Sequence, residues 1–596
     1  MPRIIQAIFV TFFALAAIVG LGATRPASSE TSQCEYWVAP GPAGSDLNPG
    51  TFDSPWATLE HASKAARDDS CTIWFKDGIY SGFNALKRRF DTPTTFRSVN
   101  DYRAVLEAYG PPLEMDGVKN MHFSGFEIRH SGPGADKTVM IMDRRDDIYW
   151  SEYVTFTNNI IHDSYNNDLF KIHNGVRHVT IRGNVFYNQG DSEEHIDANG
   201  ITDIVIEDNI FFNDFAGSGR ANSGTTKFFI TIKDSNGAED DQVGSERISV
   251  RRNIFLNWEG GTEAFINAGN DGKPYYEAKD VTFENNLLIG NSDQLVDTAF
   301  SVRGATNITF TNNTVVGDLP ARAYALRSSL TGENLKNRNL LLANNIWSDP
   351  TGTMGAGRER DPDRNRFGTG NPEDTINLVL DRNLYWNGLR PIPDRDLVAP
   401  LEADARPVVA DPLLPAGPQS LVLPRWNGPV FASGNTTIRQ EFVRLVETFG
   451  RIPPNSPAVG KADPRYAPVV DILGRPRGAA PDLGAYQAAA PDGANQAPFV
   501  DAGPDLVATL SDGALLKGFA ADDGLPDGTL ALAWTTVSGP GDVVFAAPSQ
   551  AETAADFSAG GVYRLRLSAS DGELSAQDDV IVTVVTPQAF MPLVLR

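Results

Sequence analysis

A short pattern of alternating apolar and polar residues recurs through the middle of the chain. Each copy has three alternating positions, then two polar or small residues, an asparagine and an apolar pair, as in residues 154–161 and 204–211. Alternation with a period of two predicts a short strand with one buried face. Six regular and two looser copies place their asparagines at Asn159, Asn184, Asn209, Asn253, Asn286, Asn313, Asn345 and Asn383, which are 25, 25, 44, 33, 27, 32 and 38 residues apart.

The recurrent asparagine indicates how the repeat is folded. Asparagine tolerates the left-handed conformation of a sharp corner, and its amide can bond to an identical amide one turn away. A unit of about 25 residues with three short strands and one recurrent corner predicts a coil of a parallel β-helix. The longer spacings are coils with loops inserted at a fixed corner. A β-sandwich array is the alternative, but sandwiches do not repeat a corner residue in this way.

Segments at both ends of the repeat region carry a family resemblance. Residues 33–488 resemble the secreted right-handed parallel β-helix proteins of the pectate-lyase-like superfamily. The opening similarity lies in residues 36–66, the first coils in residues 77–80 and 124–128, and the C-terminal closure in residues 456–459, 471–477 and 481–486. The resemblance implies the fold but not the activity, because this superfamily contains lyases, hydrolases, epimerases and non-enzymes.

The rest of the chain divides around this region. We expect a signal peptide at 1–30, a β-helix domain at 31–488, a linker at 489–497, an immunoglobulin-like β-sandwich at 498–586 and a tail at 587–596. The fold class is therefore all-β. The sandwich resembles PKD-like extracellular domains in residues 495–498, 502–505 and 568–572 and in Trp534. It lacks their Trp-Asp-Phe-Gly-Asp-Gly core, which favours an Ig-like relative over a PKD domain proper.

The N-terminus and the two cysteines point to export. Arg3 precedes an apolar run that ends in small residues, which is typical of a cleaved secretory signal; an uncleaved anchor is the alternative. Cys34 and Cys71 are the two cysteines of the chain, and in an oxidising compartment they predict one disulfide, with two buried thiols as the alternative. We expect a protein that is secreted, extracellular or at the cell surface.

The net charge of the chain limits the kinds of partner that we expect it to bind. The chain has 596 residues, with 51 Lys and Arg against 75 Asp and Glu, for a net charge of −24. This balance argues against a nucleic-acid partner, which requires a basic face. We expect no membrane span after signal cleavage, since no later segment is apolar enough. A monomer with a polysaccharide partner is expected.

The strands before each repeat unit contain most of the candidate chemistry. Aligning residues 170–173 with 194–197, then with 230–233, 266–267 and 300–303, predicts two columns of outward side chains. One column holds Lys171, His195, Thr231 and Ser301, and the other holds His173, Asp197, Lys233, Asn267 and Arg303. Cations thus gather on one face of an acidic protein, although a solvated face with incidental charge pairs is the alternative.

Such a face suits an acidic glycan. Abstraction of a proton next to a uronate carboxylate needs a base and a group that stabilises the charge on that carboxylate. Lys171 or Lys233 could be the base if neighbouring cations lower its pKa, and His173 and His195 are alternatives for base or acid. Arg220, in an inserted glycine-rich loop, and Asn267 and Arg303 are expected to bind substrate. The aromatic residues Trp258, Tyr275, Tyr276 and Trp347 could stack on sugar rings, although packing is the more common role of single aromatics.

A dense acidic segment suggests a metal site. Glu193, Glu194 and Asp197 could ligate Ca²⁺, and the segment loosely resembles the calcium-binding strand of alginate-lyase and chondroitinase-B-like enzymes. Those enzymes place a catalytic lysine a few residues later, where this chain has Asn199. An exposed acidic loop is the alternative reading.

The sequence therefore leaves three functions open. The first is a polysaccharide lyase that cleaves an acidic, uronate-containing glycan by β-elimination. The second is a glycoside hydrolase on the same scaffold, with Glu194 and Asp197 as candidate carboxylates. The third is a non-catalytic surface protein that binds glycans through a β-helix stalk and an Ig-like module.

Overall fold

A computed structural model describes most of the chain after its N-terminal segment. The described residues are 34–190, 194–237, 242–291, 294, 296–319, 322–357, 360–393, 398–415, 421–488, 495, 497–503, 505–511, 513–522 and 529–585. The expected signal peptide and C-terminal tail lie outside them. Within the described residues, no helix is long and apolar enough to cross a membrane.

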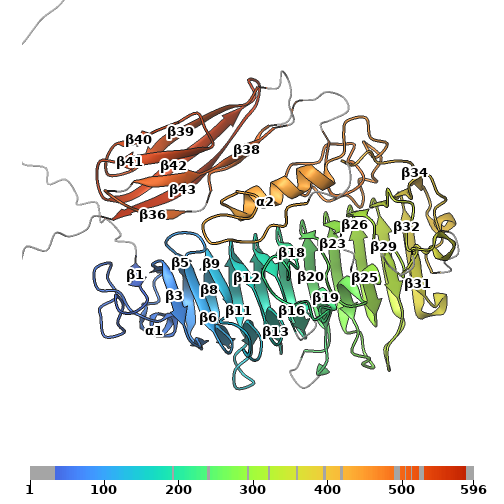
Figure 1. Ribbon diagram of the computed structural model, residues 1–596, viewed down its shortest axis with the longest axis horizontal. Helices are drawn as coiled ribbons and strands as arrows, with labels where there is room; N and C mark the ends of the chain where they lie inside the picture. The colour runs from blue at the N-terminus through green and yellow to red at the C-terminus, as the bar shows by residue number, and fades with distance from the viewer. Residues whose placement is uncertain are drawn as a thin grey trace, which may run out of the picture. The chain divides into compact units, whose positions relative to one another are not determined.

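Three long parallel sheets, here called A, B and C, wind into a parallel β-helix (Figure 1), which confirms the predicted fold. Sheet A contains β1 (Glu35–Val38), β2 (Thr72–Phe75), β5 (Arg89–Ser98), β8 (Lys119–Ser124), β11 (Glu152–Thr157), β14 (Arg177–Arg182), β17 (Thr202–Glu207), β20 (Ser245–Arg251), β23 (Ala278–Glu284), β26 (Ala305–Thr311), β29 (Asn337–Ala343) and β32 (Thr375–Asp381).

Each coil runs from sheet C through sheet A to sheet B. Sheet B contains β3 (Gly78–Ser81), β6 (Ala104–Ala108), β9 (Phe126–His130), β12 (Ile160–His162), β15 (Val185–Tyr187), β18 (Ile210–Phe212), β21 (Ile254–Phe255), β24 (Leu287–Gly290), β27 (Thr314–Gly317), β30 (Ile346–Ser348), β33 (Leu384–Trp386) and β34 (Val408–Val409). Sheet C contains β4 (Ala85–Leu86), β7 (Leu113–Asp116), β10 (Met140–Asp143), β13 (Phe170–His173), β16 (Glu194–Asn199), β19 (Phe228–Lys233), β22 (Ala264–Gly269), β25 (Thr298–Arg303), β28 (Leu326–Ser328) and β31 (Gly368–Gly370).

The eight repeat asparagines form one continuous ladder between sheets A and B. All are fully buried, and each side-chain amide donates to the side-chain oxygen of the next, at 2.9–3.2 Å. The last, Asn383, donates to Asp404 at 2.8 Å. The predicted asparagine stack is confirmed.

The left-handed corner residue is not the ladder asparagine, which corrects the sequence interpretation. The residue before it has the positive φ, as in Asn158 (56°), Asp208 (59°) and Arg252 (52°). Each ladder asparagine must point inward to reach its neighbours, so the preceding residue makes the turn. Asn, Asp and Gly tolerate that conformation best.

The N-terminal end of the stack carries α1 (Leu59–Ala65), which is visible in Figure 1, and the predicted disulfide is also found there. Cys34 and Cys71 are bonded, with Cα atoms 4.4 Å apart. The pairing of β1 with β2 brings the two cysteines together, since each immediately precedes one of these strands. Further along the chain, the described residues include the short 3-10 turns η2 (Pro362–Arg364), η3 (Pro372–Asp374) and η4 (Leu401–Ala403).

A returning C-terminal segment covers the outer face of sheet B. It contains α2 (Ile438–Leu445), whose Thr437 and Gln440 form a capping box, and the π-helical turn η5 (Val446–Gly450). Apolar residues on sheet B, such as Ile210 and Ile254, share a core with this segment. Sheet B is thereby closed by apolar packing, whereas sheet C carries the polar side chains described below.

The C-terminal module has its own core around the buried Trp534. Its strands are β35 (Phe499–Asp501), β36 (Leu506–Thr509), β37 (Ala514–Lys517), β38 (Phe519–Ala521), β39 (Ala531–Ser538), β40 (Val543–Phe545), β41 (Glu552–Phe557), β42 (Gly561–Ser570) and β43 (Ser575–Val585). The described strands form small, mainly antiparallel sheets, β36-β43-β42-β39, β37-β41-β40 and β35-β38, as predicted for a β-sandwich.

Candidate functional site

The register of sheet C decides which polar side chains meet. Lys171 of β13 pairs with Asp197 of β16, and His173 pairs with Asn199. Our expected alignment was shifted by two residues at this step, so the predicted pairing of Lys171 with His195 is wrong. The observed columns are Lys171–Asp197–Thr231–Asn267–Ser301 and Asp143–His173–Asn199–Lys233–Gly269–Arg303.

His195 lies away from this polar face. It is fully buried; its ring centroid is 4.5 Å from that of Phe229, and its Nε2 is 3.1 Å from Asn213 Oδ1. Burial lowers the pKa of His195 to about 3, so the ring is neutral. A histidine in this setting is shielded from substrate, and we do not carry it into the proposed site.

Asp197 is the centre of the polar cluster on sheet C. Its side chain is 2% exposed and lies between two lysines, with Lys171 Nζ 2.8 Å from Oδ2 and Lys233 Nζ 3.7 Å from Oδ1. Lys233 also lies 3.8 Å from Asp271. The two ammonium groups thus flank a buried carboxylate, and the lysine side chains are 30% and 14% exposed, respectively.

These carboxylates raise the lysine pKa values, contrary to our expectation. Burial alone would lower the pKa of Lys171, but attraction to Asp197 and Asp168 outweighs it. Burial is likewise outweighed at Lys233, chiefly by Asp197 and Glu194, and its pKa rises well above the usual value. Both lysines therefore carry a positive charge at neutral pH and can stabilise an anion, but are poorly suited to accept a proton.

His173 has the opposite behaviour. Its Nε2 lies 3.4 Å from Asp143 Oδ2, its side chain is 18% exposed, and Asn174 donates to the other Asp143 oxygen at 2.7 Å. Burial lowers the pKa of His173, and the attraction of Asp143 does not offset it. Among the predicted bases, His173 is thus the exposed one that is neutral near neutral pH.

Three buried carboxylates adjoin the lysines. Asp168, Glu194 and Asp197 offer oxygen atoms that all lie within 4.8 Å of one another, and each residue is at most 3% exposed. Ca²⁺ binds oxygen at 2.3–2.6 Å, so two ligands of one ion lie up to roughly 5 Å apart. Asp197 Oδ1 is buried without a hydrogen-bond partner among the described residues. The three residues therefore fit an oxygen-ligated cation.

The predicted metal ligands are only partly those of this group. Glu194 and Asp197 belong to it, whereas Glu193 lies outside the described residues. Asp168 was not predicted. It precedes β13 at a coil corner, and only the correct cross-coil register brings it beside Glu194, whose backbone N–H donates to Asp168 at 3.2 Å.

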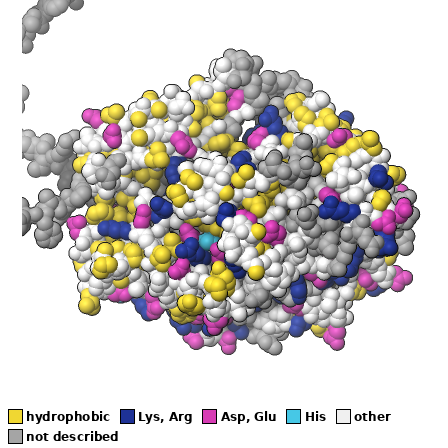
Figure 2. Space-filling model, in the orientation of Figure 1, with side chains coloured by type: hydrophobic (Ala, Val, Ile, Leu, Met, Phe, Trp, Pro, Cys, Tyr) yellow, Lys and Arg dark blue, Asp and Glu magenta, His cyan; other side chains and the backbone are white. Residues whose placement is uncertain are grey.

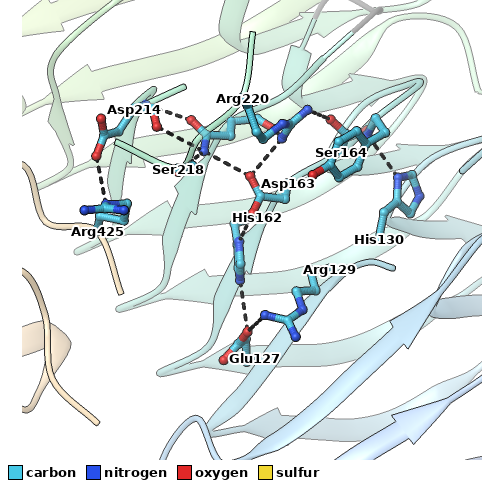
Figure 3. Close-up of polar contacts among 12 residues, drawn as sticks. Glu127, Arg129, His130, His162, Asp163, Ser164, Asp214, Ser218, Arg220 and Arg425 are labelled. Atoms are coloured by element: carbon cyan, nitrogen blue, oxygen red, sulfur yellow. Dashed lines mark hydrogen bonds and ion pairs between the residues drawn. The ribbon is translucent and has the colours of Figure 1, made fainter. Parts of the chain in front are cut away.

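Arg220 is committed to the protein rather than to an open face (Figure 3). It donates to Asp163 at 2.8 Å, to the Asn188 carbonyl at 3.0 Å and to the Ser164 carbonyl at 2.6 Å, and its guanidinium lies 4.0 Å from the Tyr165 ring centroid. Its side chain is 9% exposed. These contacts fix the inserted loop to the coil corner, so Arg220 is left out of the proposed site.

The same neighbourhood holds a buried charged histidine, His162, which the sequence analysis missed (Figure 3). It lies between Asp163 at 2.9 Å and Glu127 at 3.3 Å. Burial would lower the pKa of His162, but both carboxylates raise it to about 9. These charged residues lie at sheet B and stabilise the fold. Nearby, Arg425 of the returning segment pairs with Asp214 at 3.0 Å.

Several other candidates are also buried. Asn267 is fully buried and donates to Thr231 at 3.0 Å. Arg303 has a side chain that is 5% exposed and pairs with Glu263. Trp258 and Trp347 lie in the core, at 1% and 0% exposure. We therefore build the proposed site on Lys171, His173 and Lys233 alone.

The surface charge is mixed rather than of one sign. On the face turned to the viewer in Figure 2, positive and negative side chains are interspersed among uncharged ones. On sheet C, likewise, the cations are embedded among carboxylates.

Comparison with known proteins identifies the C-terminal module. Residues 502–584 match the model of the K319L-like PKD domain. The module is therefore of the PKD type, and the missing Trp-Asp-Phe-Gly-Asp-Gly core did not exclude it.

Solved structures resemble the chain distantly. A glycoside hydrolase is 9% identical, with 63% of this chain and 96% of that one covered and a TM-score of 0.37. PfbA, a surface adhesin of Streptococcus pneumoniae, is 13% identical, with 53% and 69% covered and a TM-score of 0.34. The PL6 family alginate lyase AlyGC is 13% identical, with 80% and 61% covered and a TM-score of 0.33. At these values the likenesses carry no argument about activity.

Proposed function

We propose that the protein is a secreted polysaccharide lyase that cleaves a uronate-containing glycan by β-elimination. One observation carries this proposal: a neutral, partly exposed histidine, His173, lies on the same face of sheet C as two charged lysines, Lys171 and Lys233. A neutral base beside fixed positive charge is what removal of a proton next to a carboxylate requires.

Each residue has a defined role in the proposed reaction. His173 takes the proton from the carbon next to the uronate carboxylate, and Lys171 and Lys233 stabilise the negative charge that develops on that carboxylate. The electrons of the broken C–H bond form a C=C bond, the glycosidic C–O bond breaks, and the departing oxygen takes a proton from water. The hydroxide that this leaves takes the proton from His173, which restores the neutral base. Asp143 Oδ2 lies 3.4 Å from Nε2 of the imidazole without a hydrogen bond, and would stabilise the imidazolium once it forms. Asp197 keeps both lysines charged.

Asp168, Glu194 and Asp197 are the residues that would hold a calcium ion. A bound ion would supply additional positive charge near the lysines. Because the three carboxylates are at most 3% exposed, we expect the ion to act through the lysine network rather than by direct contact with substrate. Added Ca²⁺ should raise the melting temperature of the wild type but not of Asp168→Asn, and an equal shift in both would contradict this assignment.

The hydrolase alternative finds less support in the geometry. Hydrolysis needs two carboxyl groups that reach the scissile bond from opposite sides. Glu194 and Asp197 are at most 3% exposed, lie in one cluster and are close to lysines. In the non-catalytic alternative, the same face of sheet C would bind the glycan without cleaving it.

A panel of glycans separates the three functions. The protein would be incubated with polygalacturonate, alginate, chondroitin and a neutral glycan. The lyase proposal predicts ultraviolet absorbance from unsaturated uronate with one of the acidic glycans. New reducing ends without this absorbance would indicate hydrolysis, and binding without either product would indicate an adhesive protein.

The extracellular location of the protein is also a proposal, and it rests on separate observations. The disulfide between Cys34 and Cys71 requires an oxidising compartment, and the PKD-type module is compatible with an extracellular protein. N-terminal sequencing of the exported protein tests the expected cleavage after residues 1–30. An intact N-terminus would instead favour an uncleaved membrane anchor.

A further inference from the structure

A second group of charged residues lies further along the face of sheet C that carries Lys171. The arginine cluster, as we define it, consists of Arg303, Arg322 and Arg327 with the carboxylates of Glu263 and Asp297. The register continues from Asn267 to Ser301 and from Ser301 to Arg327. Arg327 of β28 therefore occupies the same column as Lys171, five coils away, which is about 24 Å at ~4.8 Å per coil.

The residues between these two cations do not reach the surface. Asp197, Thr231, Asn267 and Ser301 are short, and each is at most 2% exposed. Lys171 and Arg327 have side chains that are 30% and 23% exposed. Within this column a ligand that lies along the β-helix would thus meet charge at two separate points.

The cluster contains more positive than negative charge. Among the described residues that form it, three guanidinium groups face two carboxylates. Arg327 lies 3.2 Å from Glu263 and 3.7 Å from Asp297, and Arg322 lies 3.3 Å from Asp297. Glu263 is shared, because it also pairs with Arg303.

The other charges of the cluster affect the pKa of Arg327. Burial lowers the pKa of Arg327, and repulsion from Arg303 lowers it further, so that the attraction of Glu263 does not compensate. The group stays charged at neutral pH, because even a lowered arginine pKa lies far above 7. Among the described residues, the attraction of Glu263 and Asp297 therefore does not offset burial and the repulsion of the neighbouring guanidinium groups at Arg327.

Arg327 also has an open edge. Its contacts with other described residues all use Nη1. No hydrogen bond or ion pair among the described residues uses Nη2 or Nε, and the side chain as a whole is 23% exposed. Two parallel N–H groups of one guanidinium match the two oxygens of a carboxylate, and this bidentate pairing is among the stronger polar interactions.

We propose that the arginine cluster, through Arg327 and the exposed Arg322, is a distal subsite that binds a carboxylate of the polyuronate several sugar residues away from His173. This inference rests on the proposed function, since it assumes that a polyuronate lies along sheet C. Its consequence is length dependence: a long chain reaches both Lys171 and Arg327, whereas a short oligosaccharide reaches only one of them.

Binding and turnover together test the subsite. Isothermal titration calorimetry would measure the affinity of His173→Ala protein for polygalacturonate and alginate chains and for their trisaccharides, with and without Arg327→Ala. We expect Arg327→Ala to weaken binding of the long chain about tenfold and to leave the trisaccharide unchanged. With His173 intact, Arg327→Ala should raise KM for the long chain and leave kcat unchanged.

Two further variants guard against a folding defect. Arg322 is 53% exposed, so Arg322→Ala should fold normally and weaken long-chain binding by a smaller factor. Arg67, with a side chain that is 64% exposed in the N-terminal region, provides a matched charge control in Arg67→Ala, which should leave binding unchanged.

The outcomes separate this inference from the proposed function. Unchanged long-chain affinity in both Arg327→Ala and Arg322→Ala overturns the subsite while leaving a lyase centred on His173 intact. Equal weakening for the trisaccharide and the long chain also overturns it, because the effect would not depend on length. Absence of any binding or turnover with both polyuronates overturns the proposed function and the subsite together.

Discussion

Removal of one asparagine from the ladder should destabilise the whole coil stack. The variant Asn253→Ala loses the side chain that joins its own coil to the coils on either side. Asn253 accepts from the backbone N–H of Asn209 at 3.0 Å and donates to the carbonyl of Ile206 at 2.9 Å. It also bonds to the amides of Asn209 at 3.0 Å and Asn286 at 3.2 Å.

The expected magnitude follows from these contacts. Truncation removes this partner from two backbone groups, the N–H of Asn209 and the C=O of Ile206, and each buried group left unsatisfied costs about 1–3 kcal/mol. The side-chain amides of Asn209 and Asn286 lose one bond each but keep another. With the small cavity, we expect a loss of roughly 3–5 kcal/mol, which is a large part of the stability of a typical domain. Asn253→Asp keeps the acceptor contacts but loses the donors, so it should be destabilised at neutral pH and recover partly in acid, where the carboxyl group can donate.

Urea unfolding monitored by tryptophan fluorescence would measure the loss. Ser249→Ala is the matched control, because Ser249 is a half-exposed residue of the same strand, β20. It should change the free energy of unfolding by less than about 0.5 kcal/mol. If Asn253→Ala were as stable as Ser249→Ala, the hydrogen bonds of the ladder would not stabilise the fold, and the reasoning would be refuted.

Two other predictions concern the charged site and the disulfide. Although burial would raise the pKa of Asp197, the two lysines lower it, so its contribution to stability is present above about pH 4 and is lost as the pH falls through the folded-state pKa. Asp197→Asn should therefore cost about 3–5 kcal/mol at pH 7 and less in acid, as measured by urea unfolding; a cost independent of pH would contradict the pairing. Joint replacement of Cys34 and Cys71 by serine should cost about 4 kcal/mol, and a change in melting temperature within error would show that the bond does not constrain the chain.

The repeat explains why the fold could be predicted from sequence. Every coil places the same residue type in the same environment, so the buried asparagines mark each turn independently of loop length. The positive φ of the preceding residue was harder to assign, because Asn158 and Asn159 are both asparagine and either could turn the corner. Only the inward hydrogen bonds distinguish them.

The site was predicted less well, for a definite physical reason. A slip of one residue exchanges the two faces of a strand, but a slip of two residues leaves the alternation unchanged. The sequence therefore placed Lys171 on the correct sheet face while pairing it with His195 instead of Asp197. The true register changes the electrostatics, because the lysines meet carboxylates that raise their pKa values. For this reason we propose His173, whose pKa is lowered, as the base.

Corner residues could not be placed by alternation at all. Asp168 joins the carboxylate cluster from the turn before β13. His195 follows the first residue of β16 and packs its ring beside Phe229, although the strand pattern predicted an outward side chain. Near strand ends the chain direction changes, so strict alternation no longer reports which face a side chain occupies.

The central claim is that His173 acts as the base of a uronate lyase. The most direct measurement is the pH dependence of unsaturated-uronate formation by the wild type, by His173→Ala and by His178→Ala, a control histidine on sheet A with a side chain that is 37% exposed. Because burial lowers the pKa of His173, the acidic limb of the wild-type profile should have its midpoint below pH 6.5, the usual histidine value. His173→Ala should lose at least about 100-fold in rate while His178→Ala retains it. Full activity in His173→Ala, or no unsaturated product from any polyuronate, would contradict the account.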